Sequence, residues 1–368
     1  MSDSDPRKPS PENRYSLSAL ARPGALASLA LIAAILGVVA AAFAWSAGWF
    51  SPHRVDQTHI VNAFEADGGV RAGFRRNHAK GVCFTGWFDG NGAAVPFSRA
   101  SLFERGRVPV FGRFSIAGPI APDSPAAVHS MAINYTLSDG EVWRTAMVPI
   151  PVFVVRDPKS FYDQLVAAVP DPKTGKPDPS RMKAFLAAHP ETLRAIGLIK
   201  AQPFATGFAN ERYNSLNTFL LVNAQGAATP VRWTMEPVDS FAPAPKTAPS
   251  SDPNYLFDAL GKRVSQGPVR WHLIFVLGRP GDPTNDATLP WPRDRTRIDA
   301  GTLTVTGLQA EAPGNCRDIN FDPMVLPSGI APSDDPLLPA RSAVYSADFT
   351  RREGEAKTPS PVQLQAGR

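Results

Sequence analysis

Residues 75–115 read RRNHAKGVCFTGWFDGNGAAVPFSRASLFERGRVPVFGRFS, and this stretch decides the fold. Two runs of strand-forming residues flank a turn-rich middle, and the stretch closes on the motif RFS. His78 lies just before the first run, where a neutral imidazole could act as a base while a hydroxyl such as Ser115 accepts from its Nδ1–H. Arg75 and Arg113 add permanent positive charge suited to carboxylates or phosphates. By itself this stretch leaves open a packed, hydrogen-bonded histidine without a chemical role.

A second stretch, Phe321 to Arg352, carries polar residues at helical spacing. Tyr345, Asp348 and Arg352 follow Arg341 by 4, 7 and 11 residues, so 100° per residue puts all four on one helix face. A phenol has a pKa of about 10, but a neighbouring arginine and a ferric ion both favour its anion. A tyrosinate on such a helix could therefore ligate haem iron. The alternative is a surface amphipathic helix with Tyr345 packed on the core.

Several separated motifs resemble the catalase superfamily and follow its order. They are His78-Ala-Lys-Gly, Arg113-Phe-Ser, Pro151-Val-Phe, Phe208-Ala-Asn-Glu-Arg-Tyr213 and the Phe321–Arg352 stretch. More narrowly, the chain resembles the small catalase-related haem peroxidases that keep only the catalase core, from about Val61 to about Glu355. The resemblance implies an α+β fold: a catalase-like antiparallel β-barrel core with flanking helices, preceded here by one transmembrane helix.

The resemblance also implies a haem b group and assigns it a set of residues. Tyr345 falls on the proximal iron ligand, with Arg341 keeping its phenolate ionised. His78 falls on the catalytic distal histidine and Ser115 on the hydroxyl that orients it. The other matched positions hold the cofactor: the propionate-binding arginines Arg75, Arg113 and Arg352, and the distal-pocket aromatic Phe161.

One position departs from the true catalases. Three residues before Pro151, those enzymes carry a distal asparagine, whereas this sequence has Val148. Valine offers no hydrogen bond to hold and polarise a peroxide, although Asn77 or Thr145 could replace the amide. We therefore expect a peroxidase that reduces hydrogen peroxide or organic hydroperoxides through a ferryl intermediate, with a small-molecule electron donor and weak or no catalase activity.

Three alternatives remain open at this point. Val148 motivates a haem-binding or sensing module without efficient turnover, while a true catalase would differ in needing no donor. Haem-based isomerisation of a fatty-acid hydroperoxide is chemically allowed, but no residue points to it. Peroxide loss that depends on a donor would indicate the peroxidase, and oxygen release would indicate the catalase. Haem binding without turnover would indicate the sensing module.

Composition excludes some partners. The formal net charge is +5, but the basic residues are scattered and form no nucleic-acid-binding motif, so we expect no nucleic acid partner. A homodimer is possible. The two cysteines, Cys83 and Cys316, have no metal-binding spacing and are interpreted as buried free thiols, with a disulfide as the alternative outside the cytosol.

The N-terminus predicts a membrane protein. Residues 1–22 are polar and basic, and we interpret them as a disordered cytoplasmic segment before a transmembrane anchor at 24–50. The positive-inside rule then gives a single-pass protein of the bacterial inner membrane, with the haem-binding domain, 54–355, in the periplasm and a disordered tail at 356–368. A cleavable signal peptide with an A-x-A site at 42–44 is the competing interpretation.

Sequence patterns predict several strands and helices in the exported part. Helices are expected at 61–71, 158–169 and 180–199, the last with Ser180 as its N-cap. The expected strands are 107–116, 127–137, 146–155, 269–277 and 302–306, together with a hairpin of 218–222 and 230–235 around residues 223–226. Residues 237–253 read as a Pro/Ala/Ser loop.

Overall fold

The computed structural model describes residues 23–46, 55–312 and 316–364. The chain divides into two units, Met1–Arg54 and Val55–Arg368, which are described separately. The disorder expected for residues 1–22 lies outside the described residues, as do residues 47–50 of the expected anchor.

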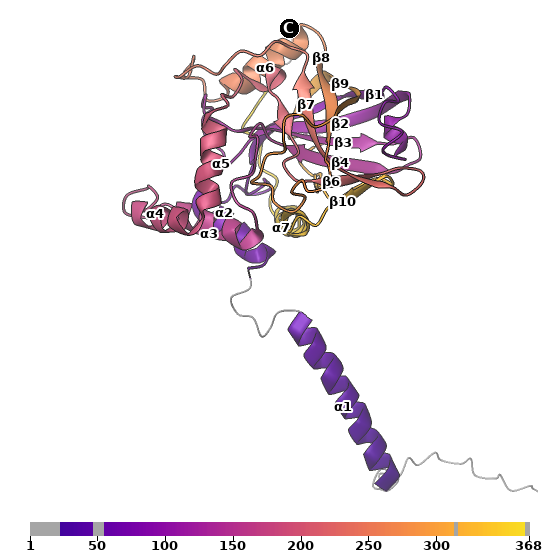
Figure 1. Cartoon of the computed structure of the whole chain (residues 1–368). Helices are drawn as coiled ribbons and strands as arrows, with labels where there is room; N and C mark the ends of the chain where they lie inside the picture. Colours follow the sequence, from indigo (N-terminus) through magenta and orange to yellow (C-terminus); the bar gives the residue numbers. More distant parts are fainter. Residues whose placement is uncertain (1–22, 47–54, 313–315, 365–368) are drawn as a thin grey trace, which may run out of the picture. The chain divides into compact units, whose positions relative to one another are not determined.

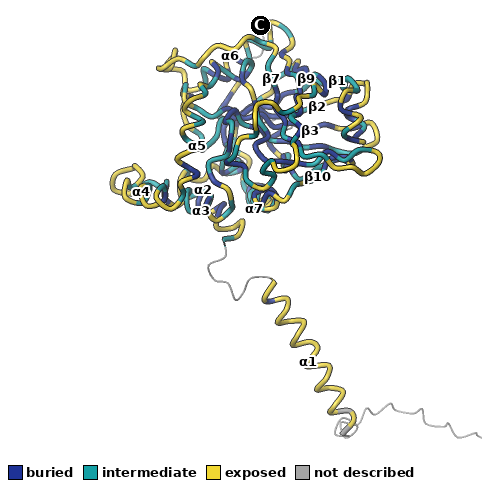
Figure 2. The backbone as a smooth tube through the Cα atoms, viewed as in Figure 1, coloured by how far each residue is buried: buried dark blue, intermediate teal, exposed yellow. Residues whose placement is uncertain are grey.

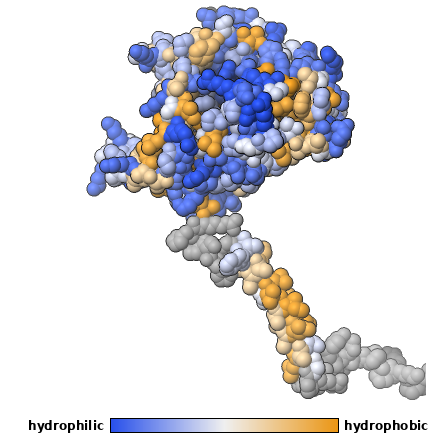
Figure 3. Space-filling view, viewed as in Figure 1, coloured by the Kyte–Doolittle hydropathy of each residue, from blue (hydrophilic) through white to orange (hydrophobic). Residues whose placement is uncertain are grey.

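The first unit contains helix α1, Pro23–Ser46, whose 24 residues include no charged side chain. At 1.5 Å per residue this helix is about 36 Å long, which exceeds the ~30 Å hydrocarbon core of a bilayer. Its segment Leu26–Ser46 has a mean hydropathy of 2.6 and is not buried against protein. Apolar residues dominate its surface in Figure 3. Among the described residues, this is the one helix with the length and composition of a membrane span.

A curled antiparallel sheet of ten strands forms the body of the second unit (Figure 1). Its order is β10-β6-β7-β8-β9-β1-β2-β3-β4, and β5 pairs with β7. The strands are β1 (Lys80–Gly90), β2 (Gly106–Ile116), β3 (His129–Thr136), β4 (Val142–Met147), β5 (Tyr213–Asn214), β6 (Phe219–Val222), β7 (Ala228–Pro237), β8 (Val269–Leu277), β9 (Arg297–Ala310) and β10 (Ile330–Pro332). This half-barrel with flanking helices confirms the predicted fold class.

Strands β1 and β2 come from the stretch 75–115 and lie at the centre of the sheet. They pair antiparallel from Lys80 opposite Ile116 to Gly90 opposite Gly106. Gly112 faces the Phe84 ring so closely that a Cβ there would lie 2.3 Å from it, and a larger residue would push the strands apart. The same register sets Ser115 opposite Gly81, three residues beyond His78.

Two strand predictions differ from the structure. The expected strand 146–155 ends at Met147, because Pro149 and Pro151 have no N–H to donate to a ladder. The expected strand 302–306 is only the middle of the 14-residue strand β9. The hairpin around residues 223–226 is confirmed, with β6 and β7 as its arms.

The helices of the second unit are α2 (Gln57–Gly68), α3 (Pro158–Ala168), α4 (Pro179–Ala188), α5 (Pro190–Lys200), α6 (Tyr255–Ser265) and α7 (Leu337–Glu353), with 3₁₀ turns at Ser101–Phe103 and Phe208–Asn210. Helix α2 begins before the expected Val61, because Asp56 caps it by accepting from the N–H groups of Thr58 and His59. Helix α6 was not predicted.

The single helix expected at 180–199 is two helices in the structure. Pro190 has no N–H and disfavours a helical conformation at the residue before it, so His189 ends α4 and precedes α5. The N-cap of α4 is Asp178 rather than Ser180, because the Asp178 carboxylate accepts from the Ser180 N–H.

The helices gather outside the curled sheet. Helices α2 and α3 pack on one another, and α2 also packs on α7 near the β10 edge (Figure 1). Figure 2 shows the buried residues concentrated along the strands, while α4 is largely exposed. The interior of the sheet is filled with aromatic side chains, including Phe114, Tyr213 and Trp271.

Two expectations about the chain's cross-links and tail are wrong. Cys83 on β1 and Cys316 form a disulfide, with their Cα atoms 5.4 Å apart, so they are not free thiols. The tail expected to be disordered is ordered up to residue 364. Val362 is fully buried, and the Pro359 carbonyl accepts a hydrogen bond from the Arg71 guanidinium. Residues 365–368 lie outside the described part.

Removing the disulfide should destabilise the domain strongly. The two cysteines are 233 residues apart, and a cross-link over so long a loop restricts the unfolded chain by about 3–5 kcal/mol. The double variant Cys83→Ser/Cys316→Ser should therefore unfold at markedly lower denaturant concentration than the oxidised protein. Detection of two reactive thiols in the denatured, unreduced protein would contradict the disulfide.

Candidate active site

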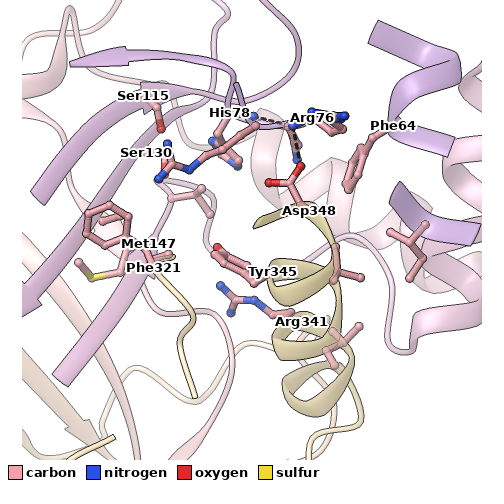
Figure 4. A pocket seen from close by; sticks show the side chains of 18 of the residues that line it. Phe64, Arg76, His78, Ser115, Ser130, Met147, Phe321, Arg341, Tyr345 and Asp348 are labelled. Atoms are coloured by element: carbon pink, nitrogen blue, oxygen red, sulfur yellow. Dashed lines mark hydrogen bonds between the residues drawn. The ribbon is translucent and has the colours of Figure 1, made fainter. Parts of the chain in front are cut away.

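One cavity between the sheet and helix α7 collects every residue that the sequence assigned to the site. Figure 4 shows His78 and Ser115 on the side of the strands, while Tyr345 and Arg341 project from α7. The lining includes all eight predicted residues: Arg75, His78, Arg113, Ser115, Phe161, Arg341, Tyr345 and Arg352. Four of them come from the 75–115 stretch and three from α7, so two segments far apart in sequence form opposite walls.

His78 occupies a constrained turn before β1. Its φ is +56°, in the left-handed region that non-glycine residues rarely adopt. Its Nδ1 is buried and has no hydrogen-bond partner among the described residues. Burial lowers the pKa of His78 to about 3, and the positive charges of Arg113, Arg75 and Arg341 contribute to the shift. The ring is therefore neutral at physiological pH and can accept a proton.

The predicted hydrogen bond from His78 Nδ1–H to Ser115 is not formed. No atom of the described chain makes a hydrogen bond with His78 Nδ1, although Ser115 is buried and lines the same cavity. In the strand register Ser115 lies opposite Gly81, whereas His78 belongs to the turn that precedes the strand. The two side chains thus line the same cavity without a hydrogen bond between them.

Arg75 and Arg113 share a buried carboxylate that the sequence did not single out. Arg113 Nε and Nη2 donate to Glu311 at 2.6 and 3.1 Å, and Arg75 Nη1 lies 3.4 Å from Glu311 Oε1. Glu311 is fully buried. Glu311 directly follows β9. The sequence did not single it out, because an acidic residue at the end of a strand is usually exposed to solvent. Only the curled sheet turns this residue toward the arginines.

The third arginine, Arg352, is held by backbone carbonyls. It donates to the carbonyls of Arg317 and Ile319, and Arg75 donates to the same Ile319 carbonyl at 2.7 Å. Burial lowers the pKa of Arg75 well below its ordinary value, and repulsion from Arg113 and Arg352 lowers it further. The cluster therefore favours an anion, and two carboxylates would suit it.

The opposite wall presents Tyr345 from α7. No described residue makes a hydrogen bond with the Tyr345 hydroxyl, which leaves its oxygen available to a metal ion. Arg341 lies one helical turn earlier and donates to the side-chain oxygen of Asn217. The Asn217 amide in turn donates to Asp335 at 2.8 Å. The sequence did not single out Asn217 or Asp335. Asn217 lies 124 residues before Arg341, and Asp335 lies just before the start of α7.

Asp348 and Arg76 connect α7 to the turn that carries His78. The Arg76 N–H donates to the Asp348 carboxylate at 3.0 Å, and burial raises the pKa of Asp348 (Figure 4). The Arg76 side chain pairs with Glu65 of α2 and with Glu355 just after α7. Through these contacts Arg76 connects the turn before β1 to α2 and to the end of α7, at one edge of the cavity. Arg76 was missed because its neighbour Arg75 matched the motif instead.

The distal wall is apolar where true catalases carry an asparagine. Val148 lines the cavity, and its backbone pairs with Asn214 through two hydrogen bonds. Thr145 is not a substitute: it accepts from Trp233 Nε1 at 3.3 Å and is not part of the lining. Phe161 belongs to an aromatic group with Phe64 and Phe153, with ring centroids 5.9 and 5.6 Å from its own.

These residues fit a haem group. Within the described part of the chain, the Tyr345 phenol oxygen has no partner and lies across the cavity from a neutral imidazole whose Nδ1 is unpaired. Three guanidinium groups at one edge favour two carboxylates. Such a donor set matches an iron porphyrin with a tyrosinate ligand and two propionates.

Comparison with known proteins identifies the family. A family model described as Catalase matches residues 44–363. The chain belongs to the catalase family. Proteins of this family bind haem, in agreement with the cavity.

The catalase-family relatives include short and long proteins. A catalase-related peroxidase of Synechococcus elongatus is 35% identical over 328 residues, covering 88% of this chain and 95% of the relative. One from Mycolicibacterium paratuberculosis is 33% identical over 299 residues, covering 80% and 94%. The catalase of Pseudomonas syringae is 26% identical to this chain. The match covers 86% of this chain but only 65% of the longer catalase.

Solved catalase structures share the fold. A bacterial catalase has a TM-score of 0.67 at 22% identity, covering 77% of this chain and 58% of that one. A fungal catalase has a TM-score of 0.68 at 20% identity, covering 77% and 60%. This chain thus spans about three fifths of the length of these larger catalases.

Glu311→Gln should separate protein stability from haem affinity. The variant leaves Arg75 and Arg113 buried without their counter-charge, which should cost the haem-free protein about 3–5 kcal/mol of unfolding free energy. Haem carboxylates can supply the missing charge, so the haem-loaded variant should lose less. Thermal unfolding with and without haem measures this difference.

Glu65→Gln is the matched control, because its partners Arg76 and Arg351 lie at the edge of the cavity rather than in the arginine cluster. It should destabilise both forms equally. Equal losses for both forms of Glu311→Gln would show that Glu311 does not compete with the haem carboxylates.

Proposed function

We propose that the protein is a haem-dependent peroxidase that reduces hydrogen peroxide or organic hydroperoxides with a small-molecule electron donor. The observation that carries the proposal is the pairing of a neutral His78 with an unpartnered Tyr345 on opposite walls of one cavity. The two most similar relatives described above are named catalase-related peroxidases, and the chain covers nearly their full lengths. A true catalase is less supported, because the relatives named catalase-related peroxidases are more similar to this chain than the catalase of Pseudomonas syringae.

The cofactor we propose is haem b, held without covalent attachment. The two cysteines form a disulfide, so neither is free to bond a haem vinyl group. Tyr345 would ligate the iron, with the charge of Arg341 favouring its phenolate. Arg75, Arg113 and Arg352 would bind the propionates, while Phe161 would line the distal side as part of its aromatic group. Bound haem supplies the redox chemistry that cleaves the O–O bond.

His78 would move the proton during that cleavage. A neutral imidazole can take the proton from the near oxygen of the peroxide and return it to the far oxygen, which leaves as water or an alcohol. Because burial and three arginines keep the His78 pKa near 3, the base is already deprotonated at neutral pH. Ser115 lines the same cavity but makes no hydrogen bond with His78, so its role in orienting the ring stays a prediction.

The proposed location is the periplasmic side of a bacterial inner membrane. Support comes from α1, which has the length and composition of a span, and from the disulfide, which persists in oxidising compartments. A chain without residues 1–46 should stay in the cytosol, with Cys83 and Cys316 reduced. Homodimer formation stays a prediction without a structural observation to support it.

The test of the proposed function is a spectrum followed by turnover. The full-length protein, purified in detergent, should bind haem with a ferric tyrosinate spectrum, and Tyr345→Phe should abolish that spectrum while Tyr162→Phe, outside the cavity, should not. Peroxide loss should depend on a phenolic donor. Oxygen release that matches peroxide loss without a donor would indicate a catalase, and haem binding without turnover would indicate a sensor.

The pH dependence of the peroxide reaction tests His78. Because its pKa is lowered to about 3, its base form persists from neutral pH down to mildly acidic pH and is lost only as pH falls toward 3. The rate constant with peroxide should therefore be flat between about pH 5 and 8 and be reduced about 10²–10⁴-fold in His78→Ala. A rate that falls with an apparent pKa near 6.5 would contradict this environment.

A further inference from the structure

Asn77 holds the backbone of the turn that contains His78. Its Oδ1 accepts from the His78 N–H at 2.9 Å and from the Gly118 N–H at 2.7 Å. The Gly118 carbonyl accepts from the Ala79 N–H at 3.1 Å, which closes the turn on the other side. His78 needs such support because its left-handed conformation, φ +56°, is disfavoured for a residue with a side chain.

The same contacts determine which way the Asn77 amide lies. Both of its partners are N–H donors, so the amide oxygen must face them and the NH₂ group must point elsewhere. No described residue accepts a hydrogen bond from that NH₂ group, and it is not among the fully buried unpaired atoms. Asn77 also lines the cavity beside His78. A neutral donor without a protein partner therefore lies at the distal wall.

The described residues around Val148 supply no free amide donor to the cavity. The Val148 side chain is apolar, and its N–H is already donated to the Asn214 carbonyl at 3.2 Å. The Asn214 amide donates to the carbonyls of Pro149 and Ile150, and Thr145 contacts Trp233. Three side-chain amides line the described cavity: Asn217 donates to Asp335, whereas Asn77 and Asn320 have no acceptor, and of these two Asn77 is the one adjacent to His78 in the chain.

We propose that Asn77 has two functions in the site: its oxygen positions His78, and its NH₂ group binds the distal ligand in place of the amide missing at Val148. This inference rests on the proposed haem peroxidase function. The ligand class is a small diatomic or peroxide group on the iron, to which Asn77 would donate one hydrogen bond. The donor thus comes from the residue next to the histidine rather than from the opposite loop.

Three variants of the full-length haem protein test the two functions. Asn77→Asp keeps the two backbone hydrogen bonds but has no NH₂ group, and Asn77→Ala loses both. Val148→Asn combined with Asn77→Asp returns an amide from the other side. The probes are the dissociation constant of cyanide for the ferric protein, followed by its spectrum, and the midpoint of thermal unfolding.

Both single variants should bind cyanide about tenfold more weakly, since one hydrogen bond to the ligand is lost. Only Asn77→Ala should lower the unfolding midpoint, because only it releases the turn. The double variant should recover most of the cyanide affinity, which a simple effect of the aspartate charge would not allow.

The outcomes also separate this inference from the proposed function. If the wild-type protein lacks a tyrosinate haem spectrum, the proposed function fails. If that spectrum is present but Asn77→Asp binds cyanide like the wild type, the donor role is wrong. An unchanged unfolding midpoint in Asn77→Ala would overturn the positioning role.

Discussion

Repulsion among three buried guanidinium groups is the constraint on which the rest of the cavity depends. Arg75, Arg113 and Arg352 converge from a turn, a central strand and the last helix, and each raises the cost of burying the others. Glu311 offsets part of this charge, and the carbonyls of the segment around Ile319 accept from Arg75 and Arg352. The fold therefore maintains a positive site that a dianionic cofactor edge would complete.

The carbonyls that hold these arginines belong to a segment without secondary structure, so it needs other restraints. The Cys83–Cys316 disulfide attaches this segment to β1, and the Cys316 carbonyl itself accepts from Arg75 at 3.1 Å. On its other side, Lys357 pairs with Asp318. The disulfide thus secures the binding edge of the cavity as well as the fold, and the ordered tail after α7 contributes to the same region.

The wall of the cavity around His78 differs from the arginine cluster, because it excludes charge. Burial and the nearby arginines keep His78 neutral, while Val148 and the aromatic group around Phe161 keep the wall apolar. A neutral base in such surroundings can accept a proton, yet it offers a bound peroxide few hydrogen bonds.

The sequence by itself determined many of the helices and strands, and its resemblance to the catalase family selected the residues that line the cavity. Alternating residues of the 75–115 stretch predicted β1 and β2, and the spacing from Arg341 to Arg352 predicted one face of α7, because both signals are local and periodic. The tertiary structure decided the rest. Glu311 reaches the arginines only through the curl of the sheet, and Cys83 meets Cys316 across 233 residues. Register likewise decided that Ser115 faces Gly81 instead of His78. Contacts between distant segments depend on strand register and packing, which no local pattern specifies.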